Sequence, residues 1–348
     1  MRRGFFVVAG LLLGAAGSAR GDAAADWQQI EAMETNAPAA QSQWKTRAEA
    51  QAGTIEYLGR QKQELLAFIA SYPQDAHVAD AKMRLAHLLA TLGDLEQEPR
   101  LRREAEGMLD ELEQEPGMRD RRADVEFARV SLLMQQVDLV TGANRDTMLE
   151  KARAFAKEFP DDRRVAALLA EVASAFEDEP KTACALLEQA RPKAQTDELR
   201  SRIDDDLKRL ALLGKPLAMR WTSVQGTRID LDRLRGKVVL IYFFASWSPP
   251  SIAELAWVQG LSAASAAIQT LGICLDNDPV AVPWTLAGRG IEWPVYCDGK
   301  GWQGELARSL GINALPQLWI VDSQGILRSV DAKQDAEALI EKAARGKD

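Results

Sequence analysis

Histidine and cysteine are scarce in this sequence. Its 348 residues include two histidines, His77 and His87, and three cysteines, Cys184, Cys274 and Cys297. Neither histidine has a cysteine nearby or a second ligand at metal-binding spacing, so we expect no metal site and no cofactor. Three cysteines allow at most one internal disulfide and leave one thiol over.

An apolar run of the ~20 residues that a membrane-spanning helix needs is also missing. The apolar segment 4–17, GFFVVAGLLLGAAG, is shorter, follows Arg2 and Arg3, and precedes small residues. This order is typical of a secretory signal peptide, which predicts that residues 1–21 are removed on export. We therefore expect the protein in the periplasm or cell envelope, with no stable membrane span after removal of the signal.

An excess of positive charge is missing as well. The formal net charge is −8. Residues 22–214 hold 26 basic and 37 acidic side chains, whereas residues 215–348 hold 14 of each sign. Because an acidic chain repels a phosphate backbone, we expect no nucleic-acid partner.

Strand signals and glycines are few between residues 22 and 213, where apolar residues recur at the helical spacing of three and four. The sequence contains one internal repeat, called the internal echo below. Its first copy is FIASYPQDAHVADAKMRLAHLLA at 68–90, and its second is FAKEFPDDRRVAALLAEVASAFE at 155–177. In each copy an aromatic residue ends a helix, proline cannot continue it, and the next Asp can accept from free amides. This resembles tetratricopeptide helical hairpins and predicts an all-α domain over 22–213. A plain helical bundle is the alternative.

The sequence pattern changes at the linker Leu213–Gly214–Lys215–Pro216, beyond which strand signals alternate with helical ones. RGKVVLIYFFAS contains a run that is apolar throughout, as in a strand buried on both faces. WSPPSIAELAWVQGLSAASAAI is helical, with Ser248 as N-cap and proline in the first turn. Strands that alternate with helices, closed by a hairpin and a helix, predict an α/β domain with a mixed sheet over 214–348.

Five segments of this domain resemble, in order and spacing, the exported thioredoxin-fold disulfide reductases of the TlpA type, relatives of the AhpC/TSA group. The segments are LGKPL at 213–217, LRGKVVLIYFFASWSPPSIAEL at 234–255, GICLDND at 272–278, WPVYCDGKGW at 293–302 and LGINALPQLWIVDSQGILR at 310–328. The resemblance implies a thioredoxin fold with a cis proline, matched by Pro316, beside a Trp-Cys-x-x-Cys motif. The positions that match this motif are Trp247, Ser248, Pro249, Pro250 and Ser251.

Serine at both motif positions removes the chemistry of the family. Disulfide exchange needs a thiolate and a sulfur that can be attacked, so Ser248 cannot form a mixed disulfide and Ser251 cannot resolve one. No histidine stands near Ser248 in the sequence to activate it. We therefore predict no catalytic residue and a redox-inactive adaptor that binds a protein or peptide partner. The backbone of Leu315, before Pro316, can still pair with an extended peptide.

Other interpretations remain open. The chain can be an oxidoreductase of the same family that uses Cys274 and Cys297. The resembled fold implies that these two residues lie at the same end of neighbouring parallel strands, within reach of a disulfide. Two free buried thiols are the competing interpretation of that pair. The domain can also be a chaperone-like peptide binder. Alternatively, it is a scaffold in which the groove between Trp247 and the Leu315–Pro316 loop binds nothing.

Overall fold

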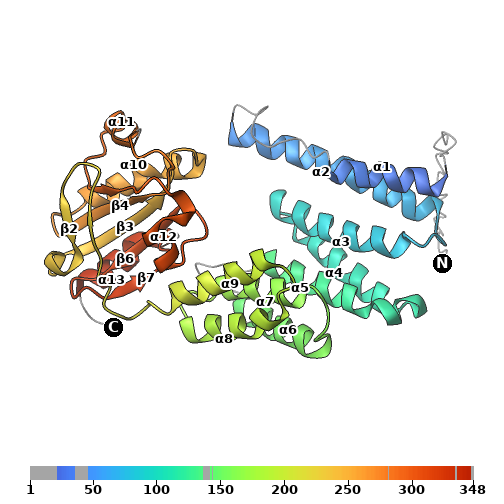
Figure 1. Cartoon of the computed structure of the whole chain (residues 1–348). Coiled ribbons are helices and arrows are strands. Elements are labelled where there is room, and N and C mark those ends of the chain that lie inside the picture. The colour runs from blue at the N-terminus through green and yellow to red at the C-terminus, as the bar shows by residue number, and fades with distance from the viewer. Residues whose placement is uncertain are drawn as a thin grey trace, which may run out of the picture. The chain divides into compact units, whose positions relative to one another are not determined.

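The structure is a computed structural model that describes residues 22–35, 46–135, 142, 144–280, 282–333 and 335–345 (Figure 1). The chain divides into two compact units, Met1–Leu132 and Leu133–Asp348. The predicted signal peptide lies outside the described residues. Within the described ranges, no helix combines the length and the apolar character needed to cross a membrane.

The described residues of the first unit form helices joined by turns, with a core that includes the fully buried side chains of Phe68, Leu85, Leu89 and Leu109. Helix α2 packs on α3, and α3 packs on α4. Its elements are α1 (Ala23–Thr35), α2 (Arg47–Ser71), α3 (Val78–Leu95), α4 (Pro99–Gln114), the 3-10 segment η1 (Pro116–Arg121) and most of α5 (Arg122–Gln135).

The second unit opens with further helices, each of which packs on the next. These are α6 (Arg145–Glu158), α7 (Val165–Ser174), α8 (Pro180–Ala190), the short η2 (Arg191–Lys193) and α9 (Asp197–Leu210). The boundary expected from the sequence, between residues 213 and 214, falls inside this unit, just after α9. Helices α6 to α9 therefore share a compact unit with the α/β part of the chain.

The internal echo has the same geometry in both copies. At the end of α2 the amide of Tyr72 donates to the carbonyl of Phe68 across 2.9 Å, and at the end of α6 Phe159 donates to Phe155 across 2.9 Å. In each pair the ring centroids lie 5.2 Å apart. The two helical hairpins therefore have the same hydrogen bond and the same aromatic contact at their turns, as the sequence predicts.

An aspartate completes each turn. The carboxylates of Asp75 and Asp162 each accept from the amide two residues ahead, His77 or Arg164, across 2.8 Å. The hydrogen bond from the backbone of His77 lowers the pKa of Asp75, and the one from the Arg164 side chain lowers the pKa of Asp162. Both carboxylates therefore stay charged where a helix start has amides to satisfy.

A mixed five-stranded sheet forms the centre of the α/β part, in the order β5-β4-β3-β6-β7. Strands β3, β4 and β5 run parallel, while β6 is antiparallel to β3 and β7 to β6. The predicted mixed sheet is confirmed. The strands are β3 (Val238–Phe244), β4 (Ile268–Cys274), β5 (Val295–Tyr296), β6 (Gln317–Val321) and β7 (Leu327–Ser329), preceded by the hairpin β1 (Arg220–Thr222) and β2 (Arg228–Asp230).

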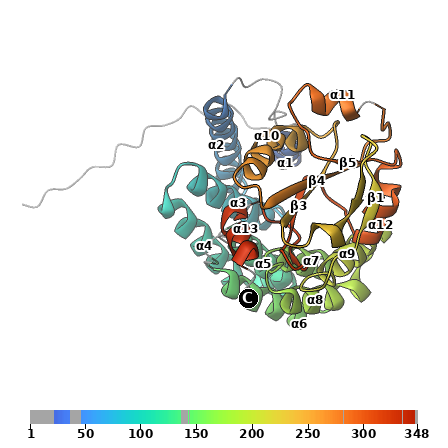
Figure 2. The same cartoon turned by 90° about the vertical axis from the view of Figure 1, so that its left-hand side faces the viewer.

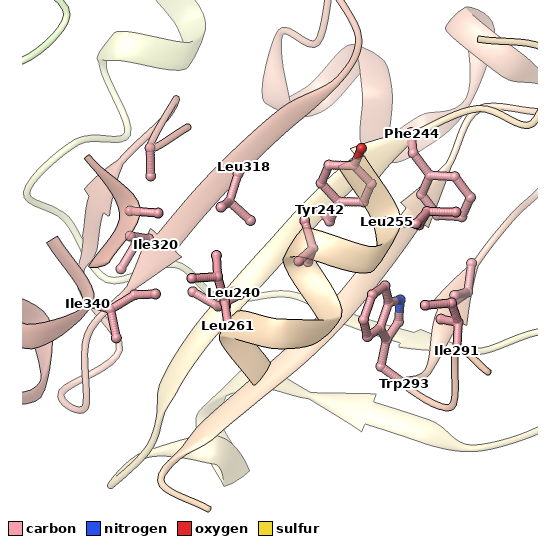
Figure 3. Close-up of a cluster of buried hydrophobic side chains, with 14 of the residues drawn as sticks. Leu240, Tyr242, Phe244, Leu255, Leu261, Ile291, Trp293, Leu318, Ile320 and Ile340 are labelled. Carbon is pink, nitrogen blue, oxygen red and sulfur yellow. The ribbon is translucent and has the colours of Figure 1, made fainter. Parts of the chain in front are cut away.

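Helices α10 and α13 cover one face of this sheet (Figure 2). Strand β3 is buried along its whole length, and Leu240, Tyr242 and Phe244 face Leu255 of α10 and Ile340 of α13 (Figure 3). Each such side chain contributes about 1.5–3 kcal/mol through burial, which fixes the carboxyl end of β3. The helical elements are α10 (Pro249–Ala263), α11 (Val282–Ala287), α12 (Glu305–Leu310) and α13 (Ala336–Arg345), with 3-10 segments η3 (Leu231–Leu234) and η4 (Gly301–Gln303).

Candidate functional site

The serine motif connects the carboxyl end of β3 to the first turn of α10. Ser248 is the N-cap, with φ −96° and ψ 104°, and its hydroxyl accepts from the amide of Ser251 across 3.4 Å. Pro249 and Pro250 take the first helical positions, where a missing N–H costs no intrahelical bond. The predicted N-cap and the proline in the first turn are both confirmed.

The side chains of Ser248 and Ser251 form a hydrogen bond with each other. The hydroxyl of Ser251 donates to that of Ser248 across 2.9 Å. Ser251 is fully buried, and Ser248 is only 7% exposed. From β3, Tyr242 donates its hydroxyl to the carbonyl of Ser251 across 2.7 Å, and burial raises the pKa of that phenol. A phenol held protonated cannot act as a base, so Tyr242 does not activate either serine.

Two tryptophans form an exposed aromatic pair next to the motif. Trp247 precedes the N-cap and is 54% exposed, and Trp302 of η4 is 38% exposed. Their ring centroids lie 6.3 Å apart at an interplanar angle of 57°. The sequence singled out Trp247 but not Trp302, although Trp302 ends one of the five segments that resemble the TlpA type.

Asp276 ties the turn before the motif to the neighbouring strands. Its carboxylate accepts from the amide of Ser246 across 2.8 Å, and its side chain is nearly completely buried. Its backbone carbonyl lies 3.6 Å from the thiol of Cys297, which donates to it. The sequence did not single out Asp276. Its place directly beyond a buried strand, in the segment GICLDND, was the available signal.

The peptide bond between Leu315 and Pro316 is cis, as predicted, and leads directly into β6. Pro316 is buried and Leu315 is half-buried. Among the hydrogen bonds between described residues, none uses the backbone amide or carbonyl of Leu315. Its amide and carbonyl therefore have no hydrogen-bond partner among the described residues.

Helix α9 packs against the loop that precedes the cis proline. The side-chain amide of Asn313 donates to Asp206 across 2.8 Å, and Arg209 donates to the Asn313 side-chain oxygen across 3.2 Å. Gly311 approaches α9 so closely that a Cβ there would lie 2.2 Å from the carbonyl oxygen of Asp205. The helical segment is therefore part of the architecture around Pro316, which the sequence did not indicate.

A cavity of about 470 Å³ lies between the cis-proline loop and helices α7 and α9. Arg209 lines it, 5% exposed, with its guanidinium 2.6 Å from Glu177 and 3.0 Å from Asp206. Burial raises the pKa of Glu177 in spite of the nearby guanidinium, and burial also raises the pKa of Asp331. The walls thus hold carboxyl groups around one buried cation. Leu315 and Pro316 complete the lining.

Cys274 and Cys297 come together at the same end of the sheet. Cys274 is the last residue of β4, and Cys297 directly follows β5. Both are thiols in this structure, as is the half-buried Cys184 of α8, whose pKa is raised by burial. Among the described residues, no group of three or more His, Cys, Asp or Glu side chains is placed to hold a metal ion.

Comparison with known proteins places the similarity in the second unit. The Redoxin family model matches residues 216–344. A thiol-disulfide oxidoreductase ResA from Bacillus thuringiensis subsp. konkukian is 25% identical over 123 residues, which cover 34% of this chain and 69% of that protein. A thiol:disulfide interchange protein DsbE from Haemophilus influenzae is 30% identical over 129 residues, which cover 35% of this chain and 68% of that protein.

The crystal structure of a thiol:disulfide interchange protein from Chlorobium tepidum TLS is 25% identical and covers 38% of this chain and 96% of its own, with a TM-score of 0.32.

Proposed function

Because the chain belongs to the thioredoxin-fold thiol–disulfide oxidoreductase family but has serine at both thiol positions, we propose that it binds a protein or peptide segment without exchanging disulfides there. The hydrogen-bonded pair Ser248–Ser251 is the observation on which this proposal rests. It keeps the helix cap and the strand–turn–helix shape of the family's site, and it contains no sulfur.

Disulfide exchange at this position fails on chemical grounds. The attacking group must be a sulfur anion, and a serine hydroxyl stays protonated near neutral pH without a base. The two histidines of the sequence, His77 and His87, belong to the first unit, and the pKa of Tyr242 is raised. A hydroxyl that is already engaged with Ser251 is a cap for α10 rather than a nucleophile.

The exposed indoles supply the binding surface. Trp247 and Trp302 present apolar rings to solvent, and aromatic residues are enriched where proteins bind one another. Covering about 100 Å² of indole surface would contribute about 2.5 kcal/mol at ~25 cal/mol per Å². The unpaired backbone of Leu315 adds a donor and an acceptor for an extended segment.

The predicted signal peptide over residues 1–21 supports an exported protein of the periplasm or cell envelope. The helical hairpins of the first unit offer a second surface, as helical repeats commonly do. An adaptor with two binding surfaces is therefore our proposal for the whole chain. A chaperone-like peptide binder is the alternative, and it differs in accepting many unrelated sequences.

A peptide selection tests the proposal. The purified chain would be panned against a random phage-displayed peptide library, and the affinity of an enriched peptide measured by fluorescence anisotropy. We expect Trp247→Ala and Trp302→Ala each to weaken binding by about 2 kcal/mol, or roughly 30-fold. Leu66→Ala, at an exposed apolar residue of the first unit, distinguishes the two proposed surfaces: unchanged affinity assigns the peptide to the aromatic pair, and weaker binding assigns it to the helical hairpins.

Enrichment of one sequence class favours the adaptor, whereas many unrelated sequences would favour the chaperone-like alternative. No enrichment, or equal affinity of the Trp247→Ala variant, would refute the binding surface.

A further inference from the structure

The register of the parallel strands places Cys274 opposite Cys297. Gly272 pairs with Val295 and Ile273 with Tyr296, so the next step along both strands is the cysteine pair. Partners at one register position of a parallel pair face the same side of the sheet, and adjacent strands lie ~4.8 Å apart. A disulfide needs its Cα atoms about 4.4–6.8 Å apart, so this placement meets the requirement.

The two thiols are in contact and differ in character. A hydrogen bond from the Cys274 thiol, together with one from the amide of Gly299, lowers the pKa of Cys297 against the effect of burial. The same thiol–thiol hydrogen bond and burial raise the pKa of Cys274. Cys274 is 3% exposed and Cys297 is half-buried. The pair thus has one half-buried thiol with a lowered pKa and one buried partner with a raised pKa.

We propose that Cys274 and Cys297 are a redox-active pair that closes reversibly into a disulfide by exchange with an external disulfide. This goes beyond the proposed binding function and does not depend on it. The pair stands at a different position from the serine motif, at the ends of β4 and β5 rather than at the start of α10.

The exchange proceeds in two balanced steps. The Cys297 thiolate attacks an external disulfide RSSR, forms a mixed disulfide with one R–S group, and releases the other as RS⁻. The Cys274 thiol then loses its proton and attacks the Cys297 sulfur, which forms the Cys274–Cys297 bond and expels the second RS⁻. Two protein thiols are oxidised, two RSH molecules are the reduced product, and the protons end on them.

Closure would join two segments that lead to the exposed tryptophans. Two residues beyond Cys274, Asp276 accepts from the amide of Ser246 in the turn that precedes Trp247. Beyond Cys297, the chain runs through Gly301, which approaches the Asn277 side chain closely, to Trp302. A disulfide would therefore restrict the segment 298–303 and, with it, one half of the aromatic pair.

The test oxidises the purified chain with oxidised glutathione, then unfolds it without a reductant and counts thiols. We expect the loss of the mass of two hydrogen atoms, one free thiol that maps to Cys184, and reversal by dithiothreitol. The variant Cys184→Ser should still form the bond. The variant Cys274→Ala should instead retain glutathione on Cys297, because the second step is lost.

Hydrogen exchange of residues 298–303 should slow in the oxidised form. Three free thiols, a bond that includes Cys184, or a lasting glutathione adduct on the wild-type chain would each overturn the proposal, and unchanged exchange would overturn the restriction of the segment. Since these measurements use no peptide, a failure of the proposed binding function would leave them unaffected.

Discussion

Ser251 donates its hydroxyl proton to Ser248 across 2.9 Å, at the two positions that match, by resemblance, the cysteines of the TlpA-type motif. The hydrogen bond spans the same two residues as a motif disulfide would, without being oxidisable. Ser251 is fully buried and Ser248 caps α10, so both side chains have structural roles. The site therefore has two hydrogen-bonded hydroxyl groups where the resemblance implies two thiols.

Restoring both sulfurs should restore disulfide exchange. We expect Ser248→Cys with Ser251→Cys to form a reversible disulfide and to reduce insulin measurably above the wild-type chain. The reason is that the strand–turn–helix context is intact and that a helix start lowers a thiol pKa. The single Ser248→Cys variant is the control, because it lacks a resolving thiol. Robust insulin reduction by the wild-type chain that persists after removal of Cys274 and Cys297 would contradict the proposed inactivity of the motif.

The buried guanidinium of Arg209 should be important for stability. Replacing it in Arg209→Met leaves the mostly buried Glu177 without its guanidinium partner and removes the nearest cation from Asp206, which we expect to cost about 3–5 kcal/mol. Urea denaturation would measure the change. Arg202→Met is the matched control, since Arg202 is half exposed and its ion-pair distances are 3.6 and 4.0 Å, so about 0–1 kcal/mol is expected. Equal effects of the two substitutions would show that the buried ion pairs of Arg209 contribute no more to the free energy of unfolding than the exposed ion pairs of Arg202.

Asp322 should make the fold sensitive to acid. Burial alone would raise its pKa, but hydrogen bonds from the amides of Ile326 and Gln324 and from Arg328 outweigh burial and hold the pKa below 3.8. A folded-state pKa below the unfolded value stabilises the protein fully above pH 3.8, and this contribution is lost as the pH falls through the folded-state pKa.

Asp322→Asn should therefore lower stability at neutral pH and flatten its decline in acid, as measured by thermal unfolding between pH 7 and pH 2. An asparagine oxygen can still accept both amide bonds, so the variant chiefly removes the charge and the bond to Arg328. Asp197→Asn is the control, because the Asp197 side chain is 96% exposed. An unchanged slope in Asp322→Asn would contradict the assignment.

Two fragments test the boundary that the sequence places between residues 213 and 214. We expect the fragment 214–348 to fold, because it contains the whole core around β3, but to be less stable than 133–348. The longer fragment retains the contacts of α9 with Asn313 and the bond from Lys208 to the carbonyl of Arg308. Hydrogen bonds to charged groups contribute about 1.5–3 kcal/mol each. Thermal unfolding that is identical in the two fragments would show that α9 is dispensable for the α/β part.

The sequence by itself determined the local structure of this protein. The apolar run VVLIYFFA predicted a strand buried on both faces, and Ser248 with the two prolines predicted the start of a helix, because burial and capping depend on neighbouring residues. The internal echo of residues 68–90 in 155–177 predicted two helix–turn–helix segments with the same backbone hydrogen bond, because this turn also depends on neighbouring residues. The resemblance of five segments to the TlpA type implied the thioredoxin fold and the cis bond before Pro316.

Only the tertiary structure decided which distant side chains meet. The indole partner of Trp247, the packing of α9 against Asn313, and the shared face of Cys274 and Cys297 each depend on strand register and helix packing. A shift of one residue between β4 and β5 would send the two cysteines to opposite faces, although the sequence would read the same. The register is set by the fit of whole side-chain layers in the core, and no local pattern encodes it.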